Sequence, residues 1–400
     1  MKLKILILLF LLPLPICRTF AQTGSISGVV IDSLTGQPVA NLTVFIPFTT
    51  VGTTTDRNGN YRIDKLPPGE HKLMFRHLSY LSVSRLIIIE PGKEVVLNIS
   101  LSEAPQYIDE VTIVGRKPNS RVAYNVFKQY FLGDVSESSC KLENPDVLNY
   151  HVDGNILEAT AKEPLIITNH HLGYRITFFL DYFQCFNNSD SIFNFNSSGN
   201  FSYSGNAFFE DLTEKQPLLA IVWKINRNNE FRGSLRQFLA CLYSNDLEKN
   251  HYTIKRPYHN SGEIQRAWKL SNAMTRVRMA QMDSIAYWNY AKGKSEILFF
   301  DPSENYHFSS EELRQGSNPD IRLLSLRFNL LVFQDQNMTG KISDSFVSIL
   351  RLPEGGISFD KEGSFRARNG EPQWVNLDNN LQVKRMLPND FMKKTKESFH

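Results

Sequence analysis

Residues 25–101 constrain the fold more than any other stretch, because they consist of short alternating runs separated by turn signals. Ile26–Asp32 alternates apolar and polar side chains, as a half-buried strand does. Asn58-Gly59 stands between Thr53–Asp56 and Tyr61–Ile63 and predicts a hairpin, because both residues tolerate a positive φ. About seven strands at regular spacing, with no helical period, predict a small antiparallel β-sandwich. The other strands are expected at Val39–Ile46, His71–His77, Leu86–Ile89 and Val95–Leu101.

The first 21 residues have the three-part form of a secretory signal. Lys2 and Lys4 give a positive start, Ile5–Ile16 is an apolar run of 12 residues, and Ala21 offers a small residue for cleavage. That run is too short to span a hydrocarbon layer of about 30 Å, so it is not interpreted as a membrane anchor. The alternative of lipidation at Cys17 is disfavoured, because bulky Ile16 precedes it. The protein is therefore expected to be exported to the periplasm, the outer membrane or the cell surface.

Loss of this leader removes three of the 44 basic residues and none of the 41 acidic ones, which leaves a mature chain without net charge. No general footprint for nucleic acid remains, and no nucleic-acid partner is expected. No later stretch approaches 18 consecutive apolar residues, so the mature chain is expected to contain no transmembrane span.

A set of residues within 22–101 matches a known pattern: Gly28, Asp32, Thr35-Gly36-Gln37-Pro38-Val39, Thr54-Thr55-Asp56, Gly59, Tyr61, Leu66-Pro67 and Gly69. With them the stretch resembles the carboxypeptidase-regulatory-like family, which implies a transthyretin-like sandwich. Ser79-Tyr80 departs slightly, since many members have Gly before the Tyr. The resemblance implies a module that accompanies certain peptidases and has no activity of its own.

The chain is expected to divide into a leader (1–21), the β-sandwich (22–101), a linker (102–118) and a larger α+β domain (119–400). The linker contains one expected strand, and its Tyr107–Gly115 run is similar to the segment that follows this module in TonB-dependent outer-membrane receptors. In the second domain apolar spacing predicts helices at Arg121–Leu132 and Phe231–Tyr243, strands at Tyr174–Tyr182, Leu323–Phe333 and Phe346–Leu352, and a loop or hairpin tip at Asn187–Asn206.

Several runs of the second domain also match a known pattern: Phe131-Leu132-Gly133, Cys140–Pro145, Pro164–Asn169, Leu172–Ile176, Trp223 with Asn226-Arg227, Gly233–Leu239 and Leu387–Phe391. With them nearly the whole mature chain resembles exported bacterial proteins that carry the carboxypeptidase-regulatory-like module followed by an uncharacterised domain. Gln237 stands where many of these proteins have His, and Phe231 where many have Tyr. The resemblance implies an envelope-associated protein of Gram-negative bacteria and no known reaction.

Motifs for catalysis are largely missing from the sequence. A zinc carboxypeptidase needs an H-x-x-E pair and a distant His, but none of the nine histidines has Glu at the third following position. His170-His171 would point to opposite faces of a strand, so the two residues are not expected to chelate one ion. Ser138–Lys141 contains S-x-x-K without its partner motifs. We therefore expect no catalytic residue, no metal site and no cofactor.

One group of side chains is a candidate binding patch. Trp223, Arg227, Arg232 and Arg236 lie on or beside the expected helices, and their guanidinium groups suit a phosphate or carboxylate. The alternative is a solvated face or a set of internal salt bridges. The aromatic residues of 193–209 have two interpretations as well: contact with sugars, or filling of a core.

Three cysteines remain after the leader: Cys140, Cys185 and Cys241. Their wide spacing does not fit a zinc or redox motif. They are interpreted as buried free thiols, with one disulfide as the alternative, because three cysteines cannot all pair within one chain.

The sequence favours a non-enzymatic envelope protein whose β-sandwich serves as a spacer or docking module and whose second domain binds a partner. The partner is expected to be an envelope protein or a glycan. One alternative is a hydrolase with a site assembled from sequence-distant residues of the second domain. Another is an accessory component of an outer-membrane system for nutrient or polysaccharide uptake.

Overall fold

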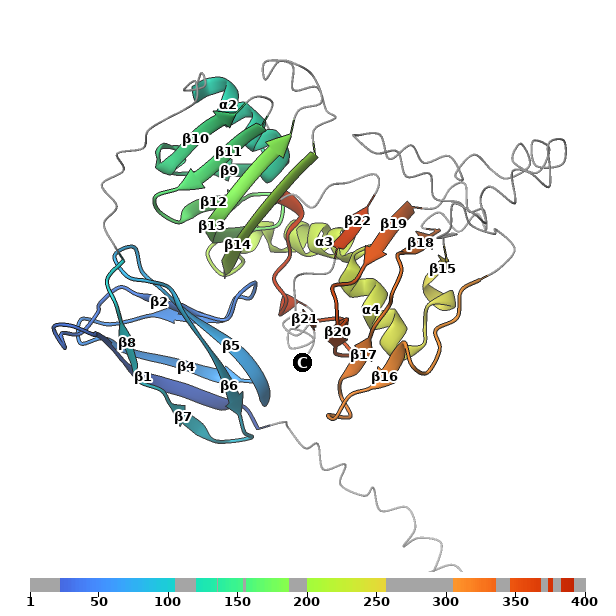
Figure 1. Cartoon of the computed structure of the whole chain (residues 1–400), viewed down its shortest axis with the longest axis horizontal. Helices are drawn as coiled ribbons and strands as arrows, with labels where there is room; N and C mark the ends of the chain where they lie inside the picture. Colours follow the sequence, from blue (N-terminus) through green and yellow to red (C-terminus); the bar gives the residue numbers. More distant parts are fainter. Residues whose placement is uncertain are drawn as a thin grey trace, which may run out of the picture. The chain divides into compact units, whose positions relative to one another are not determined.

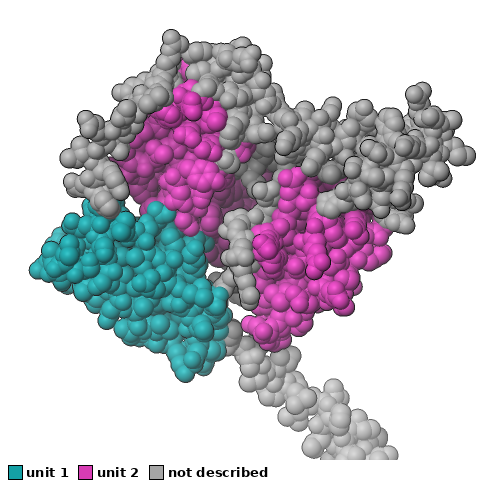
Figure 2. Space-filling view, in the orientation of Figure 1, with its two compact units in different colours: residues 1–47, 51–108 teal, residues 48–50, 109–400 magenta. Residues whose placement is uncertain are grey.

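The computed structural model describes residues 22–104, 120–134, 136–153, 156–186, 200–256, 305–335, 346–367, 373–376 and 383–391. The chain forms two compact units, coloured separately in Figure 2. Unit 1 comprises residues 1–47 and 51–108, and unit 2 comprises residues 48–50 and 109–400. The expected leader and most of the expected linker, with its strand, lie outside the described residues.

Unit 1 is a sandwich of two four-stranded sheets (Figure 1). One sheet has the order β4-β1-β7, with β8 also paired to β1, and the other has the order β3-β2-β5-β6. Alternating side chains of both sheets meet in one apolar core that includes Ile26, Val44, Phe75 and Ile99. The predicted N-terminal β-sandwich is therefore confirmed. Its strands are β1 (Gly24–Asp32), β2 (Thr43–Phe45), β3 (Gly52–Thr54), β4 (Asn60–Leu66), β5 (Gly69–Arg76), β6 (Val83–Ile89), β7 (Glu94–Val96) and β8 (Ile99–Leu101).

Unit 1 has eight described strands because the single strand predicted at Val95–Leu101 is two. β7 pairs with the first part of β1 and β8 with the last part. Between them the chain crosses Gly28, where an added Cβ would lie 1.9 Å from the Leu97 carbonyl oxygen. The Asn98 side chain accepts a hydrogen bond from the Val29 amide, 3.0 Å away. The interruption between β7 and β8 therefore lies where the Leu97 backbone approaches Gly28 so closely that only glycine fits.

The hairpin predicted at Asn58-Gly59 is wrong, although the turn itself is present. Gly59 has φ +74° and its amide donates to the Asp56 carbonyl. However, β3 pairs with β2 and β4 pairs with β1, so the turn carries the chain from one sheet of the sandwich to the other. A local turn signal does not determine which strand becomes the hydrogen-bonding partner.

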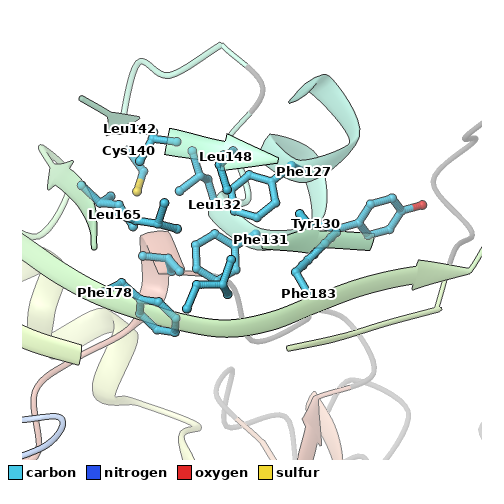
Figure 3. Close-up of a cluster of buried hydrophobic side chains, with 14 of the residues drawn as sticks. Phe127, Tyr130, Phe131, Leu132, Cys140, Leu142, Leu148, Leu165, Phe178 and Phe183 are labelled. Atoms are coloured by element: carbon cyan, nitrogen blue, oxygen red, sulfur yellow. The ribbon is translucent and has the colours of Figure 1, made fainter. Parts of the chain in front are cut away.

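The first part of unit 2 is a six-stranded sheet covered on one face by a helical segment. β13 is its centre: β12 pairs with residues 174–178, β11 with residues 183–186, and β14 with nearly its whole length. Phe127 and Phe131 from the helical segment pack on Phe178 and Phe183 of β13 (Figure 3). The elements are α2 (Ser120–Phe127), the π-helical turn η2 (Lys128–Leu132), β9 (Cys140–Leu142), η3 (Pro145–Val147), β10 (Leu148–Asp153), β11 (Ile156–Ala161), β12 (Leu165–Asn169), β13 (Tyr174–Phe186) and β14 (Asn200–Asp211).

The rest of unit 2 contains two further four-stranded sheets, with the orders β15-β18-β19-β22 and β16-β17-β20-β21. Helix α4 packs Phe238, Leu239 and Leu242 into the core that these strands share. The predicted α+β fold of the second region is confirmed. The elements are η4 (Pro217–Leu219), α3 (Ala220–Phe231), α4 (Leu235–Ser244), η5 (Glu248–Asn250), β15 (Tyr252–Lys255), β16 (Leu313–Gln315), β17 (Arg322–Leu324), β18 (Leu330–Gln334), β19 (Phe346–Arg351), β20 (Ile357–Phe359), β21 (Phe365–Ala367), β22 (Gln373–Asn376) and η8 (Val383–Arg385).

The continuous helix predicted at Phe231–Tyr243 is wrong. Phe231 ends α3, and α4 begins at Leu235. Gly233 between them has φ +74°, and the Ser234 hydroxyl accepts a hydrogen bond from the Gln237 amide as the N-cap of α4. A glycine with a positive φ followed by a capping serine separates the two helices.

Two further predictions need correction. The long strand at Leu323–Phe333 is wrong, because β17 and β18 belong to different sheets. The loop predicted at Asn187–Asn206 is wrong for residues 200–206, which belong to β14, whereas the alternative of a hairpin tip agrees with the antiparallel pairing of β13 and β14. Residues 187–199 lie outside the described part. The predicted helix over 121–132 and the strands at Tyr174–Tyr182 and Phe346–Leu352 are confirmed, as α2 with η2, β13 and β19.

Candidate functional site

Helix α3 faces the interior of unit 2 with two residues of the predicted patch, Trp223 and Arg227. They are four residues apart and therefore share one face of the helix. Trp223 is 3% exposed, and its Nε1 donates to the His170 carbonyl oxygen at 2.8 Å. Its indole ring lies over Gly173, where an added Cβ would come within 2.1 Å of the ring. Gly173 also has φ +69°, so the turn after β12 needs glycine for two independent reasons.

The Arg227 guanidinium donates four hydrogen bonds inside unit 2. Its Nε donates to the Leu172 carbonyl oxygen at 2.6 Å and one Nη to the Gly173 carbonyl oxygen at 3.0 Å. Both terminal nitrogens reach the two carboxylate oxygens of Asp211 at 2.9 Å, and the group lies 3.9 Å from the centre of the Tyr174 ring. This bidentate pair ties α3 to the end of β14.

Asp211 is held in its charged form by this arrangement. Burial raises its pKa, but hydrogen bonds from Arg227 and from the side chain and amide of Thr213 outweigh that effect. The pKa of Asp211 is therefore lowered from its ordinary value. The pair is a structural tie between helix and sheet, with both charges present at neutral pH.

The third member of the patch, Arg236, lies on α4 and is also buried. Its two terminal nitrogens donate to the carbonyl oxygens of Pro388 and Asn389, at 2.8 and 2.7 Å. Burial lowers the pKa of Arg236 to about 10, against the opposing charges of Asp360 and Asp390. The guanidinium thus fastens the C-terminal segment to the start of α4.

Arg232, the fourth member, follows the last residue of α3 and is exposed. The structure therefore does not gather the four side chains into one exposed patch, because Trp223, Arg227 and Arg236 are buried against carbonyl groups and a carboxylate. This placement corresponds to the internal interactions that the sequence left open as the alternative. Ligand binding by the four residues stays a prediction.

The runs that carry the second sequence resemblance contact one another in space. Trp223, Asn226 and Arg227 bind the backbone of the His170–Gly173 turn. Arg236 binds the Leu387–Phe391 run, and Asn144 bridges Pro164 and Ile166 through its side chain. These residues therefore connect segments of unit 2 that are distant in sequence.

A cluster of charged and polar side chains lies at the C-terminal end of α3. Glu230 receives Arg385 Nε on one carboxylate oxygen at 2.9 Å, and His171 Nε2 lies 3.4 Å from the other. Asn226 Nδ2 donates to the His171 carbonyl oxygen at 2.8 Å. Among the described residues no group of three or more His, Cys, Asp or Glu side chains is placed to hold a metal ion.

The three cysteines of the described residues, Cys140, Cys185 and Cys241, are buried free thiols. Burial raises the pKa of Cys140 to about 12 and that of Cys241 to about 11. Both side chains are therefore protonated at neutral pH and behave as small apolar groups, as Cys140 does in the core of Figure 3. Three aromatics of the 193–209 stretch contribute to this core: Phe209 is buried in it, and Phe201 and Tyr203 pack against it.

The opposite side of α3 presents an exposed apolar surface, which we call the aliphatic ridge. It begins in η4 and contains five residues whose exposed fractions are Leu218 94%, Leu219 42%, Ile221 73%, Val222 51% and Ile225 54%. Positions 218, 221, 222 and 225 have the i, i+3, i+4, i+7 spacing of one helical face. Sequence analysis missed the ridge. The spacing predicts an apolar helical face, and a buried one would normally be expected. It does not show that the face with Trp223 and Arg227 is buried instead.

Comparison with known proteins bears on unit 1. Residues 26–113 match the model of the CarboxypepD_reg-like domain. The resemblance stated from the sequence of this region is confirmed. The CarboxypepD_reg-like domain accounts for less than a quarter of the chain, and the resemblance stated for the second region stays a prediction.

Two curated relatives match over part of the chain. The TonB-dependent transporter Oar of Myxococcus xanthus is 34% identical over 105 residues, which is 25% of this chain and 10% of the relative. The TonB-dependent receptor P3 of Formosa agariphila is 26% identical over 130 residues, 32% of this chain and 11% of the relative. The chain thus spans about a tenth of the length of the curated relatives it matches.

Solved structures give only distant likenesses. A candidate carbohydrate-binding protein from Bacteroides uniformis is 12% identical, with a TM-score of 0.18, and the match covers 49% of this chain and 82% of that protein. A DUF3823 family protein from Parabacteroides merdae is 13% identical with a TM-score of 0.16, covering 50% of this chain and 86% of that protein. At these TM-scores no function is transferred. No helix in the described part of the chain is long and apolar enough to cross a membrane.

Proposed function

We propose that this chain is a non-enzymatic protein of the bacterial envelope. The CarboxypepD_reg-like domain serves as a spacer or docking module, and unit 2 binds an envelope partner through the aliphatic ridge of η4 and α3. The matched relatives are TonB-dependent proteins, which supports an envelope setting. The secretory form of residues 1–21 supports export.

The aliphatic ridge is the observation that carries this proposal. Contiguous exposed apolar surface is uncommon on soluble monomers and marks interaction sites. The ridge is also firmly supported, because Trp223 and Arg227 anchor the opposite side of the same helix to the His170–Gly173 turn and to Asp211. A surface held in place before contact loses little conformational entropy on binding.

A second candidate function is suggested by the relatives. Both matched proteins are named as TonB-dependent, one a transporter and one a receptor. An accessory role in uptake at the outer membrane would use the same ridge for contact with a protein or glycan component. It differs from the first proposal in the identity of the partner and not in the surface used.

Site-specific photo-cross-linking in a producing Gram-negative cell tests the docking surface. A photoreactive benzoylphenylalanine is placed at Ile221 in one variant and at Leu34 in another, since Leu34 of unit 1 is even more exposed, 85% against 73%. We expect adducts with envelope components from position 221 and not from position 34. Equal labelling at both positions, or none at 221, would contradict the proposal, as would peptide hydrolysis by the purified mature chain.

A further inference from the structure

We propose that strand β6 of unit 1 is a contact between two copies of this chain, which pair antiparallel about a two-fold axis at Ile87. In the described residues β6 pairs with β5 alone and is therefore the last strand of its sheet. An edge strand presents a row of backbone N–H and C=O groups with which a further strand can pair. The inference concerns unit 1 and does not depend on the aliphatic ridge.

Strand β6 lacks the features that usually keep an edge strand from pairing. It spans seven residues, Val83–Ile89, and contains no proline, no lysine and no acidic residue. Its pairing with β5 runs over all seven residues without a register shift, so no bulge turns the edge away. Its one charged side chain, Arg85, donates a hydrogen bond to the Ser84 carbonyl oxygen at 2.9 Å. The edge is therefore regular and carries a single charge.

Two aliphatic side chains make the outer face of this edge apolar. Leu86 is 65% exposed and Ile88 is 68% exposed, and both lie on the outer face because the residue between them, Ile87, is buried. On the neighbouring strand β5, Lys72 stands opposite Leu86 and Glu70 stands opposite Ile88. The outer face therefore has two adjacent rows, one with a basic and an aliphatic residue and one with an acidic and an aliphatic residue.

A second copy complements both rows when the two-fold axis passes through Ile87. Leu86 then stands opposite Ile88 of the second copy, and Ile88 stands opposite its Leu86. Each joined row begins with Lys72 of one copy and ends with Glu70 of the other. With the axis at Leu86 instead, Lys72 would share a row with Lys72 of the second copy. The register about Ile87 therefore joins aliphatic with aliphatic residues and base with acid.

This complementarity favours a second copy over a strand of another protein. Each copy supplies both rows, and the two-fold axis brings the basic row of one copy onto the acidic row of the other. A strand of another protein would need the matching order of charges on its own sheet. One strand pair is a small interface, so we expect a weak, concentration-dependent dimer.

Sedimentation of the full mature chain tests the inference. We expect a monomer–dimer equilibrium for the wild type. Leu86→Lys with Ile88→Lys should weaken dimerisation about tenfold or more, because the lysines repel those of the second copy and the aliphatic pairs are lost. Leu34→Lys is the matched control at an exposed leucine of unit 1 and should dimerise as the wild type does. A wild type that stays monomeric at every soluble concentration, or a double variant that dimerises unchanged, would overturn the inference.

Cysteine cross-linking tests the register. A mixture of Leu86→Cys and Ile88→Cys chains should form disulfide-linked dimers on mild oxidation, because these two positions face each other across the axis. Either variant alone should cross-link about fivefold less, since identical positions are then diagonal neighbours beyond the reach of a disulfide. The wild type gives the background, because its described cysteines are buried. A mixture that cross-links no better than the single variants would contradict the pairing about Ile87.

Exchange of the charges gives an independent readout. Lys72→Glu should weaken the dimer about threefold, because each row then has an acid at both ends, and the addition of Glu70→Lys should restore it. If Ile221→Lys on the aliphatic ridge dissociates the dimer while the β6 double variant does not, the ridge is the contact between copies and this inference fails. Circular dichroism and urea midpoints check the folding of the lysine variants, and the cysteine mixture decides the outcome if they misfold.

Discussion

Individual polar side chains stabilise unit 2 by donating hydrogen bonds to backbone carbonyl oxygens and by forming a few ion pairs. Arg227 and Arg236 each join segments that are distant in sequence, Arg227 through four hydrogen bonds and Arg236 through two. Most donors of these two buried guanidinium groups reach carbonyl or carboxylate oxygens, whereas Arg236 Nε has no hydrogen-bond partner among the described residues. The roles of these arginines can therefore be tested as stability effects, apart from any ligand.

Replacement of Arg227 by alanine is expected to lower the free energy of unfolding by about 3 kcal/mol or more, because Asp211 is left without its partner in a half-buried position. Arg232→Ala is the matched control: it removes the same side chain five residues later, where it is exposed, and should change stability by less than about 0.5 kcal/mol. Urea unfolding of both variants provides the measurement. Equal losses would show that Arg227 is not the tie described above.

Asp134 predicts a pH dependence of stability. Burial raises its pKa, but hydrogen bonds from Ser136, Ser139 and the Cys140 amide outweigh burial and leave the pKa well below its usual value. A carboxyl group with a lowered pKa in the folded state contributes stability above its ordinary pKa, near 4, and that contribution is lost as the pH falls below this value. Asp134→Asn should therefore be less stable than the wild type at neutral pH.

The difference between Asp134→Asn and the wild type should narrow steadily as the pH is lowered from 5 toward 2, roughly the window in which the unfolded carboxyl takes up its proton. Asp320→Asn makes the same change at an exposed aspartate, serves as the comparison and should alter stability by less than about 0.5 kcal/mol. Thermal midpoints across this range give the result. A constant gap for Asp134→Asn would contradict the assigned hydrogen-bond network.

At the scale of elements, the turn between β12 and β13 is the contact on which α3 rests. Gly173→Ala should cost about 3–5 kcal/mol, since it adds the strain of a positive φ to a clash with the Trp223 ring. Gly355→Ala is its control in the same unit, because Gly355 also has a positive φ but no atom within 4 Å of the added Cβ. It should cost only about 1–2 kcal/mol. Similar losses for both variants would mean that Trp223 does not press on the turn.

Elements with a strong local period could be predicted from the sequence, and those that depend on distant partners could not. The alternation from Tyr174 to Phe178 predicted β13 correctly. A register shift between Leu180 and Tyr182 then changes the pattern, so that Tyr182 is 44% exposed and Phe183 is buried. The apolar run Leu323–Phe333 contains no local signal that shows where one strand ends and the next begins. Its two halves, β17 and β18, belong to different sheets. Gly233 and Ser234 are a sequence signal for the end of one helix and the start of another. The apolar spacing of Phe231 and Leu235–Tyr243 nevertheless led to the prediction of one continuous helix.

The candidate site illustrates the same limit. Trp223, Arg227 and Arg236 were identified by residue type, yet whether a guanidinium meets solvent or a buried carbonyl depends on chain segments far away, such as Pro388 for Arg236. The aliphatic ridge was missed because both sides of α3 carry apolar or aromatic residues. The ridge faces outward because Trp223 packs on Gly173 and Arg227 pairs with Asp211 on the opposite side of the helix.

For the molecule as a whole, the two-unit organisation implies that the β-sandwich contains its own folding information. Its core is formed by residues between Ile26 and Leu101, and its two sheets are built entirely from β1–β8. Chains of this length form independent domains when their apolar faces close on each other, and they unfold in a single cooperative transition. Unit 1 therefore has the physical requirements of an autonomous module.

A fragment of residues 22–104 is accordingly expected to unfold cooperatively in urea, with a strand-type far-ultraviolet circular dichroism spectrum. Within it, Phe75→Ala should lower the free energy of unfolding by about 3–5 kcal/mol, because Phe75 is fully buried between the sheets. Leu86→Ala, at an exposed position on β6, should leave it nearly unchanged. A fragment that shows no transition, or equal effects of the two substitutions, would mean that the sandwich depends on unit 2 for its stability.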